Sequence, residues 1–284
     1  MLDAQAHPVG GFRSAERQDH PNTREPRLPI HRHMSVDEVL NNPKGVALLI
    51  DHTMLRPDAS QEDIARICAE ARHYGFASVC VNPYWVRFAF AALAGSGVNV
   101  CTTIGFPLGA NESATKLAEG EIALMQGAKE LDMVQNVGAL RSGNLETVEN
   151  ETRQLAQLSH SRGAILKVIL ETCCLSEEEK KTACRLAVEA GADFVKTSTG
   201  FASAGATVED VRLMRQAVGD SAGVKAAGGI RTLETLRAMV KAGANRIGTS
   251  SGVQIMHELE DDRRTDEPKP LPAAKIPGAH LDTY

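Results

Sequence analysis

Glycine residues divide the middle of the chain into units of similar length, and this division constrains the fold more than any other sequence feature. Each of these glycines ends a polar or helix-like segment and precedes a short aliphatic or β-branched run. Glycine suits the end of a helix because it adopts the left-handed conformation without a Cβ clash. The order helix, glycine, strand recurs at Gly45, Gly75, Gly97, Gly127, Gly163, Gly191, Gly223 and Gly243.

Each interval between these glycines is long enough for one strand and one crossover helix. The intervals span 20 to 36 residues. Helix N-caps are indicated by Ser60-x-x-Asp63, Ser176-x-x-Glu179 and Thr207-x-x-Asp210. Eight consecutive βα units predict an α/β protein built as a closed (β/α)8 TIM barrel. A doubly wound open sheet is the alternative fold.

The two ends of the chain differ from its middle. They hold eight of the twelve prolines, are rich in charged and polar residues and lack hydrophobic periodicity. We therefore predict a disordered N-terminal extension over 1–34, one barrel domain over 35–257 and a flexible C-terminal tail over 258–284.

Composition restricts the class of partner. Hydrophobic residues make up 43% of the chain and aromatic residues 4%, so the core is expected to be aliphatic, as in buried parallel sheets. No apolar run reaches the roughly 18 residues of a membrane span, and the N-terminus lacks an apolar signal-peptide stretch. We expect no membrane partner and a cytoplasmic location. The net charge of −5, without a dense basic block, argues against nucleic acid and favours a small-molecule substrate.

Cysteine and histidine spacing favours neither disulfides nor a metal centre. The six cysteines show no C-x-x-C pair and no disulfide framework, so we expect reduced thiols. The nine histidines form no motif such as H-E-x-x-H. We expect the protein to use neither a metal ion nor another cofactor.

Three lysines lie inside predicted strands, where an ammonium group is costly to desolvate. They are Lys167, Lys196 and Lys225 in the fifth, sixth and seventh strands. Adjacent strands lie about 4.8 Å apart, so Lys196 and Lys225 should repel each other, and one should lose its proton more easily. A neutral amine forms a Schiff base with a carbonyl carbon. Snorkelling or pairing with a carboxylate is the alternative interpretation of these lysines.

Other polar residues fall near the predicted strand ends, where a TIM barrel places its active site. Asp132 in the fourth strand is a candidate proton relay, or else the ion-pair partner of a buried lysine. Asp51 and Thr53 follow the first predicted strand. The third strand contributes Thr102 and Thr103.

Glycine-bearing loops follow the seventh and eighth predicted strands, the position where barrels commonly bind phosphate with backbone N–H groups and a helix N-terminus. The first loop holds Gly228 and Gly229. The second runs from Gly248 to Gly252 and includes Ser250 and Ser251. We predict a phosphate site there.

Motifs throughout the barrel region resemble the deoxyribose-phosphate aldolase family, in the family's order. They are Leu-Ile-Asp-His-Thr (49–53), Ala-Ser-Val-Cys-Val-Asn-Pro (77–83), Leu-Asp-Met-Val-Gln-Asn-Val-Gly-Ala-Leu (131–140), Leu-Lys-Val-Ile-Leu-Glu-Thr (166–172), Phe-Val-Lys-Thr-Ser-Thr-Gly-Phe (194–201), Val-Lys-Ala-Ala-Gly-Gly-Ile-Arg-Thr (224–232) and Arg-Ile-Gly-Thr-Ser-Ser-Gly (246–252). The resemblance implies a metal-free class I aldolase of deoxyribose catabolism. Such an enzyme reversibly splits 2-deoxy-D-ribose 5-phosphate into acetaldehyde and D-glyceraldehyde 3-phosphate.

The resemblance also implies roles for individual residues. Lys196 resembles the Schiff-base lysine, Lys225 the lysine that lowers its pKa, Asp132 the proton-transfer carboxylate and Lys167 a further site lysine. Substrate contacts are then expected from Asp51, Thr53, Thr199, Gly200, Gly228, Gly229, Gly248, Ser250 and Ser251. A homodimer or higher homo-oligomer is expected.

At two positions the members of the family differ from one another. Phe201 stands where some members of the family carry a lysine, which removes one cation for phosphate. Some members end in a tyrosine that assists proton transfer, so Tyr284 is a candidate for that role, with a disordered terminus as the alternative. Two further functions stay open: another class I aldolase or phosphate-handling barrel enzyme, and a catalytically silent barrel that binds a phosphorylated metabolite.

Overall fold

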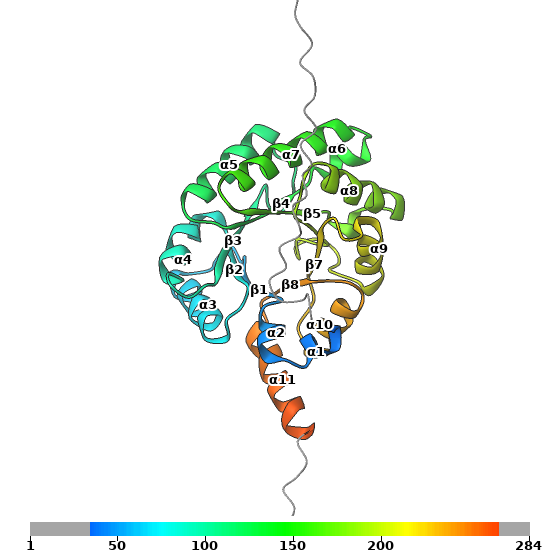
Figure 1. Cartoon of the computed structure of the whole chain (residues 1–284). Helices are drawn as coiled ribbons and strands as arrows, with labels where there is room; N and C mark the ends of the chain where they lie inside the picture. Colours follow the sequence, from blue (N-terminus) through cyan, green and yellow to red (C-terminus); the bar gives the residue numbers. More distant parts are fainter. Residues whose placement is uncertain (1–34, 267–284) are drawn as a thin grey trace, which may run out of the picture.

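A closed barrel of eight parallel strands forms the centre of the molecule, as predicted (Figure 1). The structure, a computed structural model, describes residues 35–266. Every strand pairs with its neighbours in sequence, and β8 pairs with β1 to close the barrel. The strands are β1 (Ile50–Met54), β2 (Ser78–Val81), β3 (Asn99–Ile104), β4 (Glu130–Val134), β5 (Ile165–Ile169), β6 (Phe194–Lys196), β7 (Gly223–Ala227) and β8 (Arg246–Thr249).

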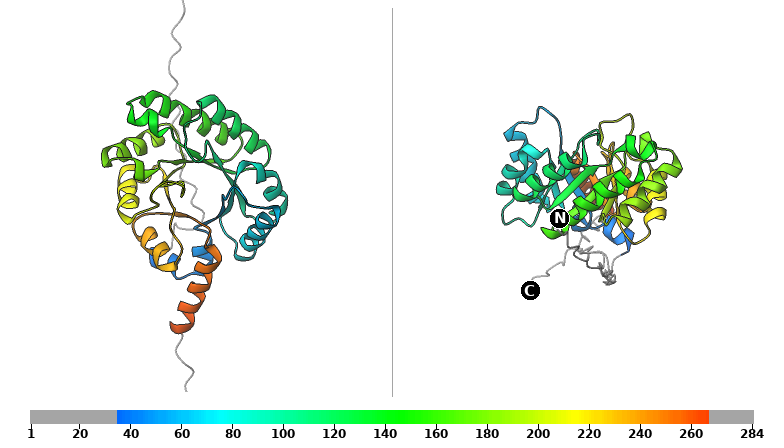
Figure 2. Two further views of the ribbon diagram at one scale, coloured as in Figure 1. Left: turned by 180° about the vertical axis from the view of Figure 1, so that it is seen from behind. Right: turned by 90° about the horizontal axis from the view of Figure 1, so that it is seen from above.

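Helices surround the strands as an outer ring, which Figure 2 shows from two further sides. Their apolar faces bury an aliphatic core against the barrel, in agreement with the composition. The helices are α1 (Val36–Leu40), α2 (Pro43–Ala47), α3 (Gln61–Tyr74), η1 (Pro83–Trp85), α4 (Val86–Ala92), α5 (Ser113–Met125), α6 (Val137–Arg141), α7 (Leu145–Ser161), η2 (Thr172–Cys174), α8 (Glu177–Glu189), α9 (Val208–Val218), α10 (Leu233–Lys241) and α11 (Gly252–Asp266).

Most of the junction glycines have the conformation that their position requires. Six of the eight have a positive φ, namely Gly75, Gly97, Gly127, Gly163, Gly191 and Gly243. The predicted caps also form: the side chains of Ser60 and Ser176 accept the N–H groups of Asp63 and Glu179 in capping boxes.

Gly45 and Gly223 are exceptions to the predicted order of helix, glycine and strand. Gly45 lies within α2, where a Cβ atom would come within 2.7 Å of the Val39 carbonyl oxygen of α1. The first strand consequently starts at Ile50, later than the sequence indicates. Gly223 is itself the first residue of β7, and a side chain there would overlap the Phe194 ring inside the barrel. Both glycines permit close packing instead of ending a helix.

The C-terminal helix continues beyond the predicted end of the barrel domain. Helix α11 passes residue 257 and reaches Asp266, and Leu259 is fully buried. The predicted extension over 1–34 and the tail from 267 to 284 lie outside the described residues. Within residues 35–266, none of the helices combines the length and apolar character that crossing a bilayer requires.

Candidate active site

Three tiers of side chains that point into the barrel hold its buried charges. Successive residues of a strand point to opposite faces, and barrel tiers draw four side chains from alternate strands. From the N-terminal end of the strands upward, the tiers are Ser78, Glu130, Phe194 and Arg246, then Asp51, Cys101, Lys167 and Lys225, then Cys80, Asp132, Lys196 and Gly248. The charged members contact one another within and between tiers, and we call them the interior cluster: Asp51, Glu130, Asp132, Lys167, Lys196, Lys225 and Arg246.

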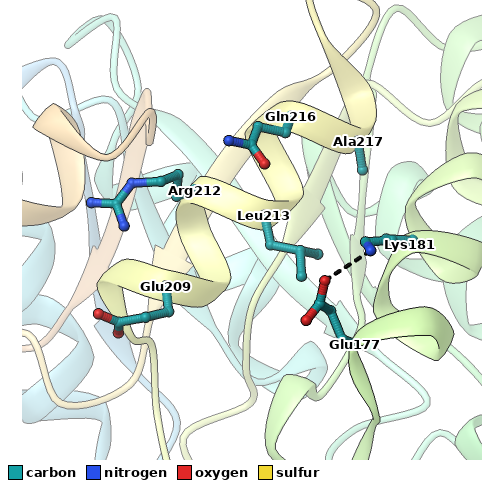
Figure 3. A pocket seen from close by; sticks show the side chains of 7 residues that line it. All are labelled: Glu177, Lys181, Glu209, Arg212, Leu213, Gln216 and Ala217. Carbon is teal, nitrogen blue, oxygen red and sulfur yellow. Dashed lines mark ion pairs between the residues drawn. The ribbon is translucent and has the colours of Figure 1, made fainter.

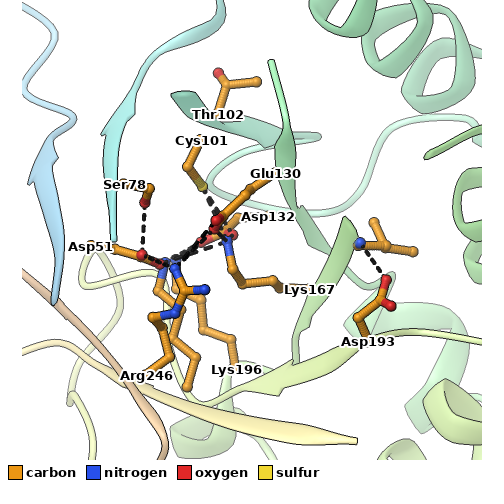
Figure 4. A network of polar contacts seen from close by, with 12 residues as sticks. Asp51, Ser78, Cys101, Thr102, Glu130, Asp132, Lys167, Asp193, Lys196 and Arg246 are labelled. Atoms are coloured by element: carbon orange, nitrogen blue, oxygen red, sulfur yellow. Dashed lines mark hydrogen bonds and ion pairs between the residues drawn. The ribbon is translucent and has the colours of Figure 1, made fainter. Parts of the chain in front are cut away.

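Asp132 is the centre of the interior cluster (Figure 4). Its Oδ2 atom accepts hydrogen bonds from Lys196 Nζ at 2.7 Å and from Lys225 Nζ at 2.8 Å. Its Oδ1 atom accepts from Lys167 Nζ at 2.9 Å and from the Cys101 thiol at 3.2 Å. One carboxylate therefore joins all three strand lysines, and the two on β6 and β7 share a single oxygen.

Two more carboxylates and an arginine contact the lysines deeper in the barrel, toward the N-terminal ends of the strands. Asp51 accepts from Arg246 at 2.6 Å and forms an ion pair with Lys225 Nζ at 2.5 Å. Glu130 lies 2.5 Å from Lys167 Nζ and 3.2 Å from Arg246. Sequence reasoning missed Glu130 and Arg246. Glu130 lies two residues before Asp132 and hence on the same strand face, which is the signal that would have found it.

The interior cluster stabilises its own charges. Burial alone would raise the pKa of the Asp132 carboxyl, but Lys167, Lys196 and Lys225 hold it well below its ordinary value. Burial would lower the pKa of Lys167 and Lys225, but Asp132 and the other carboxylates raise both above the ordinary lysine value. Asp132 is therefore an anion, and Lys167 and Lys225 are cations, at neutral pH.

Lys196 differs from the other two lysines in position. It is the last residue of β6, and its side chain is 3% exposed, whereas those of Lys167 and Lys225 are completely buried. Its one ion-pair partner in the described part of the chain is Asp132. Of the three amines, Lys196 is the one placed to meet a substrate that enters from the C-terminal ends of the strands.

Asp51 and Thr53 lie deeper than the sequence indicates. Because β1 starts at Ile50, both belong to the strand and do not follow it. Asp51 is enclosed by Ser78, Lys225 and Arg246. The Thr53 hydroxyl donates to the Asp51 carbonyl oxygen at 2.9 Å. These contacts give Asp51 a role in holding Lys225 and Arg246.

The loop after β6 is fixed by a carboxylate from the neighbouring loop. Glu171 accepts hydrogen bonds from the Thr199 N–H, at 3.2 Å, and from the Thr199 hydroxyl. Glu171 itself has a left-handed backbone, with φ 56°. Gly200, the residue after Thr199, has a φ of 85°. The Thr199 side chain is thus used to order the loop that begins directly after Lys196.

The two glycine loops predicted to hold phosphate lie at the C-terminal ends of β7 and β8. Gly228 and Gly229 have φ values of 91° and 83°, which strongly favour glycine. Gly248 belongs to β8, and Ser250 and Ser251 lead directly into the N-terminus of α11. The geometry offers backbone N–H groups and a helix N-terminus at one place.

The structure describes Phe201 but not Tyr284. Phe201 is about half exposed and packs edge-on against Phe106, with ring centroids 5.2 Å apart. It adds an apolar surface beside the loop that starts at Thr197. Tyr284 lies outside the described residues, so its role remains a prediction.

Two groups of side chains bring metal-ligand atoms together, but cations of the protein already contact them. Cys80, Cys101 and Asp132 form one group, and Asp51, Cys101 and Glu130 the other, with ligand atoms within 4.8 Å of one another. Lys167, Lys196, Lys225 and Arg246 pair with their carboxylates. A metal ion would have to displace or repel these cations. The expectation of a metal-free site stays a prediction.

A hollow lies between α8 and α9 on the helical ring (Figure 3). It contains the ion pair between Lys181 and Glu177 at 2.8 Å, one helical turn apart on α8. Its remaining lining comes from α9. The residues around it are Glu177, Lys181, Glu209, Arg212, Leu213, Gln216 and Ala217.

A TIM barrel that places lysine amines beside a buried carboxylate has the side chains that Schiff-base chemistry on a carbonyl compound requires. Comparison with known proteins gives the family. The family model described as DeoC/LacD family aldolase matches residues 45–258, so this chain belongs to that family of aldolases.

Individual relatives agree with the family assignment. A protein from Brevibacillus brevis named deoxyribose-phosphate aldolase is 61% identical over 208 residues, covering 73% of this chain and 93% of that protein. One of the same name from Thermococcus kodakarensis is 55% identical over 223 residues, covering 78% and 100%. The tetrameric deoxyribose phosphate aldolase structure from Aeropyrum pernix is 34% identical with a TM-score of 0.73, covering 80% and 99%.

Proposed function

We propose that this chain catalyses the reversible cleavage of 2-deoxy-D-ribose 5-phosphate to acetaldehyde and D-glyceraldehyde 3-phosphate, with Lys196 as the Schiff-base residue. The observation that carries the proposal is the shared Asp132 oxygen, which lies 2.7 Å from Lys196 Nζ and 2.8 Å from Lys225 Nζ. The names of the relatives support the choice of substrate. The reaction belongs to deoxyribose phosphate catabolism.

The interior cluster holds one more basic side chain than it has carboxylates. Its ion pairs join Lys167, Lys196, Lys225 and Arg246 to three carboxylates. A lysine attacks a carbonyl carbon as the neutral amine. Lys167 and Lys225 are less suited to that role, because several carboxylates raise their pKa.

The reaction then follows from the positions of Lys196 and Asp132. The neutral Nζ attacks C1 of the open-chain sugar, and the C1 oxygen takes up one proton from the amine and one from solvent and leaves as water, which gives a protonated imine. Asp132 receives the proton from the C3 hydroxyl, the C2–C3 bond breaks, and its electron pair moves into the imine to form an enamine. D-Glyceraldehyde 3-phosphate departs. Asp132 returns its proton to C2 of the enamine, and hydrolysis then releases acetaldehyde, free Lys196 and the proton taken up from solvent.

The phosphate group of the substrate is assigned to the loops after β7 and β8. Gly228 and Gly229 allow close backbone approach, and Ser250 and Ser251 add hydroxyls at the N-terminus of α11. Phe201 supplies no cation, so we expect weaker phosphate binding than a lysine there would give. Gly248 leaves room beside Lys225, because a Cβ atom would come 3.0 Å from Lys225 Cε.

We further propose a homo-oligomer in the cytoplasm that needs no metal or nucleic acid. Phe90 of α4 and Ile122 and Met125 of α5 are exposed apolar residues, and the Phe90 ring packs against Gly127 after α5. Such a patch is typical of an interface between subunits. Light scattering of the full chain and of a Met125→Glu variant tests this, and a monomeric wild type contradicts it.

Trapping of the imine tests the proposed function. Borohydride reduction in the presence of acetaldehyde should add one ethyl group, localised to Lys196 by peptide mass spectrometry. Lys196→Ala should abolish the label, whereas Lys181→Ala, which changes an exposed lysine on α8, should retain it. A label that persists in Lys196→Ala contradicts the assignment. Binding of the phosphosugar without any trapping would favour a barrel that binds a metabolite but does not react.

A further inference from the structure

Thr103 places a hydroxyl group inside the barrel directly beside Asp132. It lies two residues after Cys101 on β3, whose thiol contacts Asp132 Oδ1 at 3.2 Å. Alternation along the strand therefore turns Thr103 to the same inner face, one step closer to the C-terminal ends of the strands. In the pairing of β3 with β4, Thr103 lies directly opposite Asp132.

The Thr103 hydroxyl is buried without a hydrogen-bond partner. The side chain is fully inaccessible, and no group of the described chain donates to or accepts from its Oγ1 atom. Cys101, two residues earlier on the same strand face, belongs to a small apolar cluster with Leu55 and Cys80, and Phe106 packs against this cluster. A buried hydroxyl without a partner is unfavourable, which indicates a group that is bound from outside.

Thr102 provides a direct comparison with Thr103 on the same strand. Thr102 is equally buried, but it points away from the interior cluster (Figure 4), and its hydroxyl donates to the Val81 carbonyl oxygen at 2.7 Å. The two adjacent threonines thus differ in hydrogen bonding. The outward-facing hydroxyl donates to a protein carbonyl oxygen, and the inward-facing one has no partner within the described chain.

We propose that the Thr103 hydroxyl binds the C3 oxygen of the substrate, the atom that becomes the carbonyl oxygen of D-glyceraldehyde 3-phosphate. The inference rests on the proposed function, because it takes Lys196 as the attachment point of C1. From Lys196, whose Nζ contacts Asp132, the substrate extends two more carbons toward the strand ends, which brings the C3 oxygen to the level of Asp132 and Thr103. Thr103 donates a hydrogen bond to the C3 oxygen while the proton of the C3 hydroxyl passes to Asp132. The Thr103 hydroxyl keeps its own proton and is unchanged.

The inference separates two halves of the reaction. Imine and enamine formation from acetaldehyde involves Lys196 and Asp132 but no C3 oxygen. Cleavage of deoxyribose phosphate involves that oxygen. Removal of the Thr103 hydroxyl should therefore slow cleavage and leave the acetaldehyde half-reaction intact.

Thr103→Val removes the hydroxyl at nearly constant volume, and Thr103→Ser retains it. For Thr103→Val we expect kcat/KM for cleavage to fall about 10-fold or more, while NMR-detected exchange of the acetaldehyde methyl protons in D2O stays within about 2-fold of wild type. We expect Thr103→Ser to recover most of the cleavage rate. Thr102→Val is the matched control, with a lower Tm and an unchanged kcat/KM.

The outcomes are distinguishable. Unchanged cleavage by Thr103→Val, or an equal loss in Thr103→Ser, overturns the inference. A parallel loss of exchange and cleavage also overturns it, because the effect would then lie on Lys196 or on folding. If wild type itself shows no exchange, the proposed function fails instead.

Discussion

Two buried groups of charges in this barrel have net pKa shifts of opposite direction, although burial acts on both in the same way. In the interior cluster, Asp51 and Asp132 have lowered pKa values, and Lys167 and Lys225 have raised ones, despite burial. The second group is the pair of Lys116 on α5 and Glu151 on α7, 2.9 Å apart and also buried. There, burial lowers the pKa of Lys116 and raises that of Glu151, and their mutual attraction does not fully offset this.

The difference comes from the number of opposite charges around each group. Asp132 contacts three lysines, and Lys225 contacts two carboxylates. Glu151 has one cation and the Asn136 N–H at 2.9 Å, and Lys116 has one anion and the Val134 carbonyl oxygen at 2.9 Å. Desolvation of each ion costs several kcal/mol, so a single pair cannot recover what a network of several partners can. The network keeps charges available for chemistry, and the pair anchors the end of β4.

The largest expected effect comes from removing the centre of the network. Asp132→Asn leaves three lysines without their shared anion and removes the proposed proton acceptor. We expect kcat to fall by about 10²- to 10⁴-fold, with a loss of stability of about 3 kcal/mol or more. Steady-state kinetics and urea unfolding measure the two effects. Wild-type kcat in this variant would exclude Asp132 from proton transfer.

An intermediate effect is expected from breaking the pair on the helices. Glu151→Gln leaves Lys116 buried without its anion, and we expect a loss of about 3 kcal/mol in the free energy of unfolding. The label on Lys196 should persist, because Glu151 does not belong to the interior cluster. A double-mutant cycle with Lys116→Met should give a coupling energy of about 1–3 kcal/mol. A loss of trapping as large as that of Asp132→Asn would contradict the separation of the two groups.

The smallest effect is on the pH dependence of stability, and its sign differs between the groups. Asp51 has a folded-state pKa below its ordinary value of 3.8, so its contribution is present above pH 3.8 and is lost as the pH falls. Glu151 has a folded-state pKa above its ordinary value of 4.5, so stability falls as the pH rises from 4.5 toward that value.

Urea unfolding between about pH 2 and pH 7 checks both signs. We expect Glu151→Gln to remove the decrease in stability that accompanies a rise in pH above 4.5. Asp51→Asn should remove the decrease in stability that accompanies a fall in pH below 3.8. If both variants change the pH profile in the same direction, the contrast between pair and network is wrong.

Particular residues show how far sequence reasoning reached. The regular glycine spacing gave the closed barrel, and the lysines inside predicted strands led to Lys167, Lys196 and Lys225, which one carboxylate joins in the structure. The prediction that Asp51 follows the first strand was wrong, because the chain forms the short helix α2 first and β1 therefore starts later. Glu130 and Arg246 were missed because each looks like an ordinary charged residue at the start of a strand.

The sequence by itself determined the order of strands and helices and which strands carry ionisable side chains, because glycine conformation and hydrophobic alternation act over a few residues. Only the tertiary structure decided which charges meet, since the pairing of strands brings Asp132 to Lys196, 64 positions away, and to Lys225, 93 positions away. It also decided which hydroxyl of Thr102 and Thr103 lacks a partner. Desolvation and hydrogen bonding depend on neighbours in space, and closure of the barrel supplies those neighbours.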